Sequence, residues 1–373
     1  MNIAVNMRLV IQDKMEGIGW FAYETMSRLA KNHPEHNFIF IFDRPVHPSL
    51  LFPKNVRIII KGPPTRHPLL WYMWFEWIIP AILRNTRADL FISPDGYASL
   101  KTKVPTICVI HDINFIYHPE YLPSLAARYF TYFIPKFAKK ASRIGTVSEY
   151  SRMDISKSFG VSEERIDVYY NGANDAYRPM NPVLQQEIRN KYTRGKPYFI
   201  FVGALSPRKN VPGLLKSFDR YCEMGGESSL VIVGDALHKT EEITECYNGM
   251  KFAKRVHFVG RLKVDELSKV MSSAISLVFI PFFEGFGIPL VEAMYCDTPV
   301  LCSNVTSLPE VVEDAALMSD PNDYESIASN MLLIETDSIL RNKLIENGRL
   351  QRAKFSWELS AERVWMSIEK LTR

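Results

Sequence analysis

Short runs of apolar and β-branched residues recur along the chain, and stretches with a helical spacing of apolar residues separate them. Seven runs come first and six follow: residues 3–6, 38–42, 56–60, 90–93, 106–110, 144–147 and 166–169, then 198–202, 230–233, 256–259, 275–280, 300–302 and 316–318. Strands that alternate with helices indicate parallel sheets with helices on both faces. The pattern predicts an α/β protein of two Rossmann-like domains facing each other across a cleft, with ligands beyond the carboxyl ends of the strands.

The boundary between the two domains is predicted near residues 175–195, where a polar segment with two prolines, Asn174 to Pro182, precedes a short charged helix. We expect residues 1–175 to form the first domain and residues 176–355 to form the second. The final segment, 356–373, places apolar residues on one side of a helix: Trp357, Ala361, Val364 and Ile368. This spacing predicts a C-terminal helix with one buried face.

The segment with the most specific pattern is Phe-Glu-Gly-Phe-Gly-Ile-Pro-Leu-Val-Glu-Ala, residues 283–293. It follows a predicted strand and opens a predicted helix, in which Pro289 occupies a first-turn position that needs no N–H group. The N–H groups at a helix start bind anions, and Gly285 and Gly287 allow a bulky ligand to approach the backbone. Two carboxylates, Glu284 and Glu292, frame this turn and are suited to bind the hydroxyl groups of a sugar and a ribose. A helix start with two solvated acids is the alternative interpretation.

The pattern of Glu284, seven residues and Glu292 resembles the donor-site signature of retaining GT-B glycosyltransferases of the glycosyltransferase family 4 type. That family includes sucrose synthase and many lipopolysaccharide mannosyl- and glucosyltransferases. The resemblance implies that Glu292 binds the ribose of a nucleotide sugar and that Glu284 lies near the hydroxyls of the transferred sugar. It also implies that the C-terminal helix packs on the first, acceptor-binding domain, while the second domain binds the nucleotide sugar.

A second motif, Val-Gly-Ala-Leu-Ser-Pro-Arg-Lys-Asn, covers residues 202–210 and leads from a strand into a helix. Gly203 lies at the strand end, and Arg208 and Lys209 lie where the resembled family binds the diphosphate. A guanidinium and an ammonium group make complementary contacts with phosphate. Exposed Arg–Lys pairs are common, but the position after a strand and a glycine favours the phosphate-binding role. Arg261 lies in the loop that the family uses, mostly through its backbone, to contact the nucleobase.

In the first domain, Glu-Gly-Ile-Gly at residues 16–19 partly matches the Gly-Gly-Ile-Gly loop of the family. Gly17 and Gly19 are expected either to close over the donor diphosphate or the acceptor, or to form a tight turn. A dinucleotide fingerprint needs a third glycine where the chain has Ala22, which disfavours an NAD-dependent dehydrogenase.

His111 and Asp112 follow another predicted strand, and the resemblance places such a histidine near the donor sugar and the acceptor. The alternative is a histidine whose ring is satisfied by a main-chain carbonyl. Metal binding is disfavoured because no second ligand lies at a suitable spacing. In Thr-Val-Ser-Glu-Tyr-Ser, residues 146–151, Ser148 is suited to cap a helix, and the motif resembles the family more than it indicates catalysis.

Composition and charge limit the cellular compartment and the classes of partner that we expect for this protein. The net charge of +4 over 373 residues is mild and argues against a dedicated nucleic-acid-binding protein. The five cysteines contain no Cys-x-x-Cys pair and are typical of core residues in a reducing compartment. The N-terminus does not resemble a signal peptide, and no apolar run approaches the roughly 18 residues of a spanning helix. A cytoplasmic protein is expected.

Two aromatic segments are candidates for a peripheral contact with the inner face of the membrane. Residues 67–83 are rich in Trp, Tyr and Phe but lack a basic face, which favours core or interdomain packing. Residues 126–140 end with Lys136, Lys139 and Lys140, the basic flank that a peripheral contact needs. A solvated helix end is the preferred interpretation of this second segment.

The resemblance therefore predicts a retaining, metal-independent glycosyltransferase that moves a hexosyl group from a nucleoside-diphosphate sugar to a glycan or lipid-linked glycan. No cofactor or metal is expected, since the sequence contains no Asp-x-Asp motif. The expected catalytic residues are His111, Arg208, Lys209 and Glu284. The expected donor-binding residues are Gly17, Gly19, Gly203, Arg261, Gly285, Phe286, Gly287, Ile288, Leu290 and Glu292.

GDP-mannose is the first candidate donor and UDP-glucose the second, because residues 283–289 and the stretch Leu-Pro-Glu-Val at 308–311 look like the bacterial mannosyltransferase branch. Two alternatives share the fold. A nucleotide-sugar epimerase would keep the donor site, and a non-catalytic member of a polysaccharide assembly complex would lose it.

Overall fold

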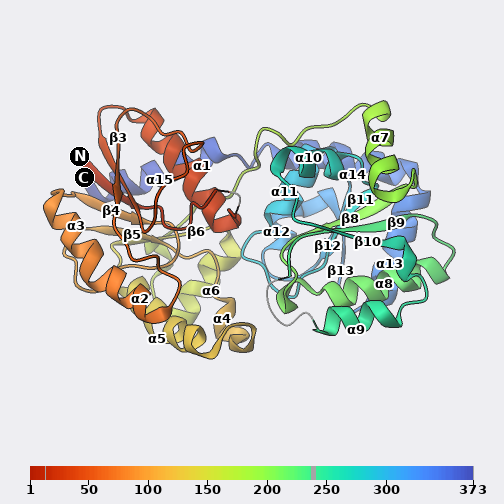
Figure 1. Ribbon diagram of the computed structural model, residues 1–373, viewed down its shortest axis with the longest axis horizontal. Coiled ribbons are helices and arrows are strands. Elements are labelled where there is room, and N and C mark those ends of the chain that lie inside the picture. The colour runs from red at the N-terminus through yellow and green to blue at the C-terminus, as the bar shows by residue number, and fades with distance from the viewer. Residues whose placement is uncertain (13, 237–240, 373) are drawn as a thin grey trace. The chain divides into compact units, whose positions relative to one another are not determined.

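The computed structural model describes residues 1–12, 14–236 and 241–372, which form two compact units (Figure 1). Unit 1 contains Met1–Asn171 and Ser356–Arg373, and unit 2 contains Gly172–Phe355. The chain leaves unit 1 after Asn171, slightly before the boundary expected at residue 175, and returns to it at Ser356.

Unit 1 is built on a parallel sheet that has, among the described residues, seven strands in the order β3-β2-β1-β4-β5-β6-β7. The strands are β1 (Asn2–Asn6), β2 (Asn37–Phe42), β3 (Val56–Ile60), β4 (Leu90–Ser93), β5 (Thr106–Val109), β6 (Arg143–Thr146) and β7 (Ile166–Val168). The strand order reverses between β1 and β4, which pair directly. Their carboxyl ends therefore form the switch point, where open parallel sheets bind ligands.

Helices cover both faces of this sheet, with α1 and α15 on one side and α2, α3 and α5 on the other (Figure 1). The helices are α1 (Gly17–Asn32), α2 (Pro68–Met73), the π-helical turn η1 (Trp74–Ile78), α3 (Ile79–Asn85), α4 (Asn114–Tyr117), α5 (Ser124–Lys140), α6 (Glu149–Phe159) and α15 (Trp357–Thr372).

Unit 2 repeats this topology with a parallel sheet that has, in the part of the chain described, six strands in the order β10-β9-β8-β11-β12-β13. The strands are β8 (Tyr198–Val202), β9 (Ser229–Val233), β10 (Val256–Gly260), β11 (Ser276–Phe279), β12 (Val300–Ser303) and β13 (Ala316–Ser319). Its switch point lies at the carboxyl ends of β8 and β11, which also pair directly.

The helices of unit 2 again lie on both faces, with α8, α9 and α13 on one and α10, α11 and α14 on the other (Figure 1). They are α7 (Pro182–Thr193), α8 (Val211–Glu223), α9 (Glu241–Gly249), α10 (Val264–Ser272), α11 (Ile288–Tyr295), α12 (Leu308–Val312), α13 (Tyr324–Thr336) and α14 (Ser338–Arg352).

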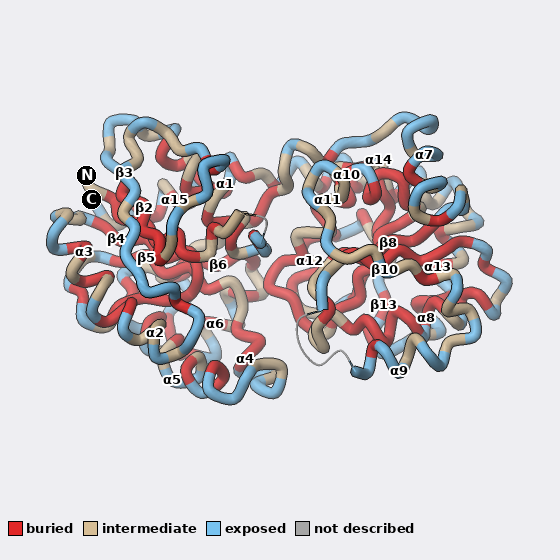
Figure 2. Tube along the Cα trace, viewed as in Figure 1, coloured by how far each residue is buried: buried red, intermediate tan, exposed pale blue. Residues whose placement is uncertain are grey.

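Every strand predicted from the apolar runs is present, with ends that differ by at most one residue. The central strands are apolar throughout because helices cover both of their sides. All residues of β8 and β9 are buried, and Figure 2 shows the strands as the buried centre of each unit. Four cysteines lie in these cores, as the sequence predicts: Cys108, Cys222, Cys296 and Cys302.

The aromatic segment 67–83 packs mainly into the core of unit 1. Trp74 and Phe75 are fully buried, and the ring of Trp71 stacks on that of Phe130 at 5.5 Å. Core packing, the preferred interpretation of this segment, is therefore confirmed, although Leu69 and Trp77 remain exposed. Across residues 1–12, 14–236 and 241–372, none of the helices has the length and apolar character needed to cross a membrane.

The C-terminal helix α15 is held on unit 1 by the carboxylate of Asp167 in the edge strand β7. Arg143 of β6 lies 2.5 Å from it, and Ser367 and Lys370 of α15 donate to it at 2.7 and 2.8 Å. Burial raises the pKa of Asp167, but its bonds with Arg143, Lys370 and Ser367 outweigh burial, so the net pKa is lowered. The charged form of Asp167 therefore stabilises the folded protein.

We expect Asp167→Asn to lower the free energy of unfolding at pH 7 by about 2 kcal/mol, because two ion pairs lose their carboxylate. A lowered pKa stabilises the fold above the unfolded-state pKa, and this stabilisation is lost as the pH falls through the folded-state pKa. The difference from the wild type should therefore shrink as the pH falls below 3.8, the ordinary value for Asp. Urea titrations of both proteins at pH 7 and at pH 3 measure the free energies of unfolding. An equal difference between wild type and variant at the two pH values contradicts this account.

Candidate functional site

The predicted strand, turn and helix at residues 275–293 are present in unit 2. Helix α11 begins at Ile288 directly after the turn, with Pro289 in its first turn. Gly287 adopts the left-handed region, at a φ of 91°, and a Cβ atom there would lie 2.8 Å from a methyl carbon of Leu308. Glycine is thus required at position 287 both by the backbone conformation and by the packing.

Glu284, in this turn, forms an ion pair with Lys209, in the loop after β8. The two side chains are in direct contact, and Nε of Arg208 lies 4.0 Å from the same carboxylate oxygen. Glu284 and Lys209 side chains are only 9% and 11% exposed, whereas that of Arg208 is 28% exposed. The structure therefore brings three of the four predicted catalytic residues together at the switch point of unit 2.

The backbone of Glu284 is held in place from the loop after β12. Its N–H group donates to Thr306 Oγ1 at 3.2 Å, and Ser307 Oγ donates to its carbonyl oxygen at 2.9 Å. The position of the Glu284 carboxylate is therefore set by main-chain hydrogen bonds as well as by the cations.

Asn210 fixes the loop that carries Arg208 and Lys209. It adopts the left-handed region and caps helix α8, since its Oδ1 accepts the N–H of Gly213 at 3.2 Å. Its Nδ2 donates to the carbonyl oxygens of Ile280 and Pro321 at 3.1 and 2.8 Å. One buried amide thus ties the loop that carries Arg208 and Lys209 to the end of β11.

The stem of Lys209 lies against the end of the sheet. Its Nζ is 4.8 Å from the centre of the Phe279 ring, and a Cβ atom on Gly203 would lie 3.5 Å from its Cε. The N–H of Phe282 donates to the carbonyl of Arg208 at 3.0 Å, which joins the two loops through the backbone. A Cβ atom at position 203 would thus make only an ordinary contact with the lysine stem, so this packing does not by itself require glycine.

Glu292 lies on α11 and is closely surrounded by protein. Burial raises the pKa of Glu292 to about 7, and a hydrogen bond from the hydroxyl of Tyr177 partly opposes this rise. Tyr177 is itself buried, in the segment that opens unit 2. Near pH 7 the Glu292 carboxyl is therefore poised between its neutral and charged forms.

Some predicted donor-binding residues present no side chain to a ligand. Phe286 is 3% exposed and packs on Phe355 with ring centres 5.5 Å apart, and the side chain of Leu290 is fully buried. The Leu290 N–H donates back to the carbonyl of Gly287 at 3.0 Å, so neither its amide nor its side chain is directed outward. That the amides near Gly287 to Leu290 contact the diphosphate stays a prediction, and the tight first turn engages the Leu290 donor. Arg261 is exposed, and its N–H donates to Asp235 at 3.2 Å.

The remaining predicted residues belong to unit 1. Gly17 is exposed at the start of α1, whereas Gly19 is buried, and a Cβ atom on Gly19 would lie 2.7 Å from the carbonyl oxygen of Leu9. Gly19 is therefore required for packing. His111 follows β5, and its Nε2 lies 2.8 Å from the carbonyl oxygen of Pro94, so the main-chain contact considered from the sequence is present.

Ser148 caps helix α6 as predicted, since its Oγ accepts the N–H of Ser151 at 3.1 Å. Ser151 Oγ in turn donates to the carbonyl oxygen of His111 at 3.2 Å. The motif at 146–151 thus helps to hold His111, a role that the sequence did not predict.

Two family models together cover most of the chain. Residues 15–177 match the model described as Glycosyltransferase Family 4, and residues 185–351 match the one described as Glycosyl transferases group 1. The O-antigen chain mannosyltransferase B of Escherichia coli is 31% identical over 278 residues, which cover 74% of this chain and 73% of that protein. The chain is a member of this glycosyltransferase family. The O-antigen chain mannosyltransferase RfbU of Salmonella typhimurium is 28% identical over 72% of this glycosyltransferase and 71% of its own length.

Solved structures share the fold of this glycosyltransferase over its whole length. Sucrose-phosphate synthase from Thermosynechococcus elongatus has a TM-score of 0.81 at 18% identity and covers 100% of this chain and 99% of its own. Anabaena HepE in complex with UDP and glucose has a TM-score of 0.77 at 17% identity, with 99% of each chain covered. The predicted GT-B fold of two Rossmann-like units is confirmed.

Sequence reasoning missed several residues that build the site of this glycosyltransferase. Asn210 was visible directly after Arg208 and Lys209, and a cap residue at a helix start is a recognisable signal. Thr306 and Ser307 lie more than twenty residues from Glu284, and Tyr177 lies in a segment that looks like a linker. No local pattern connects Thr306 and Ser307 to the backbone of Glu284, or Tyr177 to the carboxyl of Glu292.

Proposed function

We propose that this glycosyltransferase transfers a mannosyl group from a nucleoside-diphosphate sugar to a glycan or lipid-linked glycan, with retention at the anomeric carbon and without a metal ion. The observation that carries the proposal is the convergence of Arg208, Lys209 and Glu284 at the switch point of unit 2. GDP-mannose is the first candidate donor, because the two relatives described above are named O-antigen chain mannosyltransferases. UDP-glucose is the second, since UDP and glucose are bound in the Anabaena structure.

The chemical step breaks the bond between the anomeric carbon and the diphosphate oxygen, so negative charge grows on the leaving group. Arg208 and Lys209 are fixed cations beside the place where that charge develops, and preorganised groups of this kind each contribute roughly 10²–10³ in rate. The acceptor oxygen forms its bond on the same face of the sugar. Its proton passes to the departing phosphate oxygen, so no side-chain base is needed.

The two glutamates have different roles in this proposal. Glu284 lies beside the cations and faces the transferred sugar, where positive charge develops at the anomeric carbon. Its carboxylate therefore acts more strongly in the transition state than in the ground state. Glu292 binds the ribose hydroxyls, which react in neither state, and it therefore contributes uniform binding.

The purified protein should release nucleoside diphosphate from GDP-mannose faster than from UDP-glucose, and excess EDTA should leave this rate unchanged. Lys209→Ala should lower kcat at least roughly ten- to hundredfold, because a hydrogen bond to a charged group is worth about 1.5–3 kcal/mol. Release of nucleoside diphosphate, measured with and without an added glycan acceptor, checks both expectations.

The same assay separates the alternatives. Complete loss of turnover in EDTA, restored by magnesium or manganese, rules out metal independence. An epimer or free sugar as the main product in the presence of acceptor favours an epimerase, and no turnover with either donor favours a non-catalytic assembly protein.

Affinity for free nucleoside diphosphate should distinguish the two carboxylates. Glu292→Gln should weaken GDP binding about ten- to hundredfold, because the charged ribose contact is lost, whereas Glu284→Gln should bind GDP nearly normally and lose kcat. Since ribose hydroxyls donate to the ionised carboxylate, wild-type affinity should rise as the pH increases through about 7, the pKa of Glu292. Calorimetric titration of GDP into each protein at pH 6, 7 and 8 measures these effects.

Glu292→Gln is also the control for this pH dependence. The phosphate of GDP titrates near pH 6 itself, and the variant retains that contribution while it loses that of Glu292. Because burial raises the folded-state pKa of Glu292, the wild type loses stability as the pH rises through about 7. The variant should therefore melt no lower than the wild type at pH 8. If Glu292→Gln and Glu284→Gln weaken the binding of GDP equally, the roles of the two glutamates are wrongly assigned.

We also propose that the protein acts in the cytoplasm and that α5 makes a peripheral contact with an anionic membrane. The helix exposes Leu125 and Tyr132, and Nζ of Lys136 lies 3.3 Å from the centre of the Tyr132 ring. Lys139 and Lys140 are exposed in its last turn. Aromatic and basic side chains on one helix fit an interface that carries negative headgroups.

The protein should co-sediment with vesicles that contain anionic phospholipid and less with purely zwitterionic ones, and added salt should weaken this binding because it screens the charges. A variant with Tyr132→Ser and Lys136→Gln should lose most of the binding. Trp77→Ser is the matched control, since Trp77 is a comparably exposed aromatic residue of the other segment. If only Trp77→Ser loses vesicle binding, the membrane contact is made by residues 67–83 and not by α5.

A further inference from the structure

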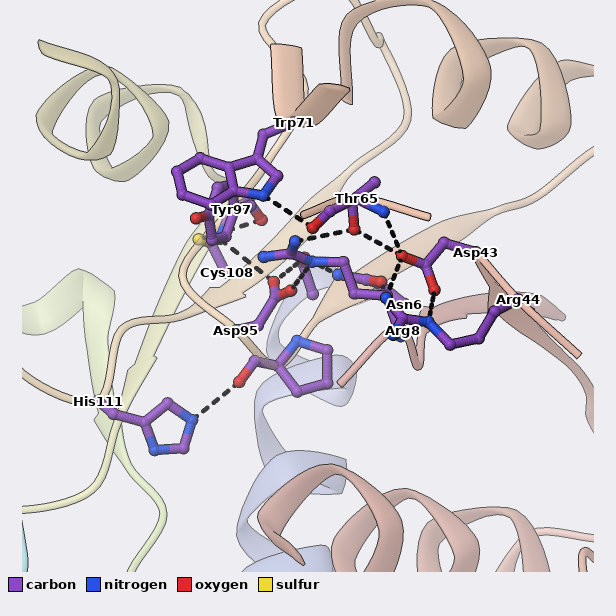
Figure 3. A network of polar contacts seen from close by, with 12 residues as sticks. Asn6, Arg8, Asp43, Arg44, Thr65, Trp71, Asp95, Tyr97, Cys108 and His111 are labelled. Carbon is purple, nitrogen blue, oxygen red and sulfur yellow. Dashed lines mark hydrogen bonds and ion pairs between the residues drawn. The ribbon is translucent and has the colours of Figure 1, made fainter. Parts of the chain in front are cut away.

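A buried polar network occupies the switch point of unit 1, and the function proposed above gives it no task (Figure 3). Arg8 follows β1, Asp43 follows β2 and Asp95 follows β4, and these residues are 4%, 1% and 9% exposed. Buried charges are costly unless they are paired and hydrogen-bonded. A network of this kind at the ligand-binding edge of a sheet therefore calls for a specific role.

The guanidinium of Arg8 is the centre of the network. Its Nε lies 2.5 Å from Oδ2 of Asp95, and its Nη1 donates to Thr65 Oγ1 at 3.1 Å. The Thr65 hydroxyl donates in turn to Asp43 at 2.7 Å, and the guanidinium lies 4.2 Å from the centre of the Tyr97 ring. Arg8 is thus held by Asp95 and Thr65, from the segments after β4 and β3, and by the rings of Tyr97 and Phe75, the second at 5.3 Å, which leaves the ion pair with Asp95 in one geometry.

Asp95 in turn holds the backbone of the turn that follows β4. Its second carboxylate oxygen accepts the Ser93 hydroxyl at 3.0 Å and the N–H of Tyr97 at 3.4 Å, so it spans the turn from both sides. Pro94 lies inside this turn, and its carbonyl oxygen is the one that lies 2.8 Å from Nε2 of His111. Figure 3 shows the arrangement, with a dashed line for this contact at the His111 ring.

A carbonyl oxygen only accepts hydrogen bonds, so the contact with Pro94 requires the proton of His111 to be on Nε2. The edge of the ring packs against Phe21, with ring centres 5.0 Å apart and planes at 87°, which fixes the tilt. Burial lowers the pKa of His111, although Pro94, Asp112 and Asp95 oppose this, so the ring is neutral at pH 7. A neutral ring with its proton on Nε2 has an acceptor at Nδ1 and no second donor.

We propose that Arg8 and Asp95 are positioning residues that hold His111 in the Nε2–H tautomer, so that Nδ1 accepts a hydrogen bond from a substrate hydroxyl. The proposal rests on the proposed function, because the family resemblance places such a histidine near the donor sugar and the acceptor. It assigns His111 to hydroxyl recognition and not to the stabilisation of the diphosphate, for which a neutral acceptor is unsuited.

The tautomer can be measured directly by long-range ¹H–¹⁵N correlation spectra of protein labelled at its eight histidines, with His111→Gln to identify the signals. In the wild type, Nδ1 of His111 should resonate as an unprotonated nitrogen between pH 6 and 8. In Asp95→Asn and in Arg8→Lys, the ¹⁵N chemical shifts of the two ring nitrogens should move toward each other, because both tautomers are then populated. Transfer should lose kcat by roughly ten- to hundredfold, as expected for a misplaced substrate contact, with an unchanged KM for the donor.

Asp167→Asn is the matched control, because it breaks another ion pair of unit 1 that does not touch Pro94 or His111. It should lower stability and leave the His111 signals in place. Wild-type His111 protonated on Nδ1 would overturn the proposal without any variant. Unchanged ring signals in Asp95→Asn and Arg8→Lys, or an equal change in Asp167→Asn, would do the same.

The spectra also separate this proposal from the proposed function. Wild-type turnover in His111→Gln would remove His111 from the proposed site, whereas the ring signals would still report whether Arg8 and Asp95 set its tautomer. Loss of turnover in His111→Gln together with unchanged signals in Asp95→Asn would keep the function and reject the positioning.

Discussion

The ion pair between Lys209 and Glu284 is the interaction on which the candidate site of unit 2 depends. It joins the carboxyl ends of β8 and β11, the two neighbouring strands at which the order of the unit 2 sheet reverses. Parallel strands end on the same edge, so a residue after each strand is brought into contact although 75 positions separate them in sequence. The surrounding contacts serve this pair: Asn210 fixes the lysine loop, and Ser307 fixes the backbone of the glutamate.

The sequence contained most of this arrangement because its signals are local. Apolar runs predicted each strand, and the glycines and Pro289 predicted the turn that opens α11. What was not predicted depends on contacts between distant segments. Tyr177 lies in an apparent linker and sets the environment of Glu292, and the tight first turn that uses the Leu290 amide is a detail of backbone geometry.

The same limit explains why the network of unit 1 went unnoticed. Arg8 and Asp95 are 87 residues apart, and neither belongs to a recognisable motif. His111 was found because it ends a strand, but its partner Pro94 is a carbonyl group, and main-chain acceptors leave no trace in a sequence. The state of a histidine is thus decided by atoms that a pattern of side chains does not describe.

The two switch points carry the same kind of ion pair, but their burial gives them different uses. The Arg8 and Asp95 side chains are 4% and 3% exposed, and separating them would leave a buried charge unpaired, which is strongly unfavourable. The Lys209 and Glu284 side chains are 11% and 9% exposed, and Arg208 beside them is 28% exposed, so it is Arg208 that opens this cluster to solvent. An anionic ligand can therefore share these cations with the carboxylate, and each charge keeps a partner while the ligand enters and leaves. The pair of unit 1 thus serves to hold the structure, whereas the pair of unit 2 stands beside a cation, Arg208, that an anionic ligand can reach.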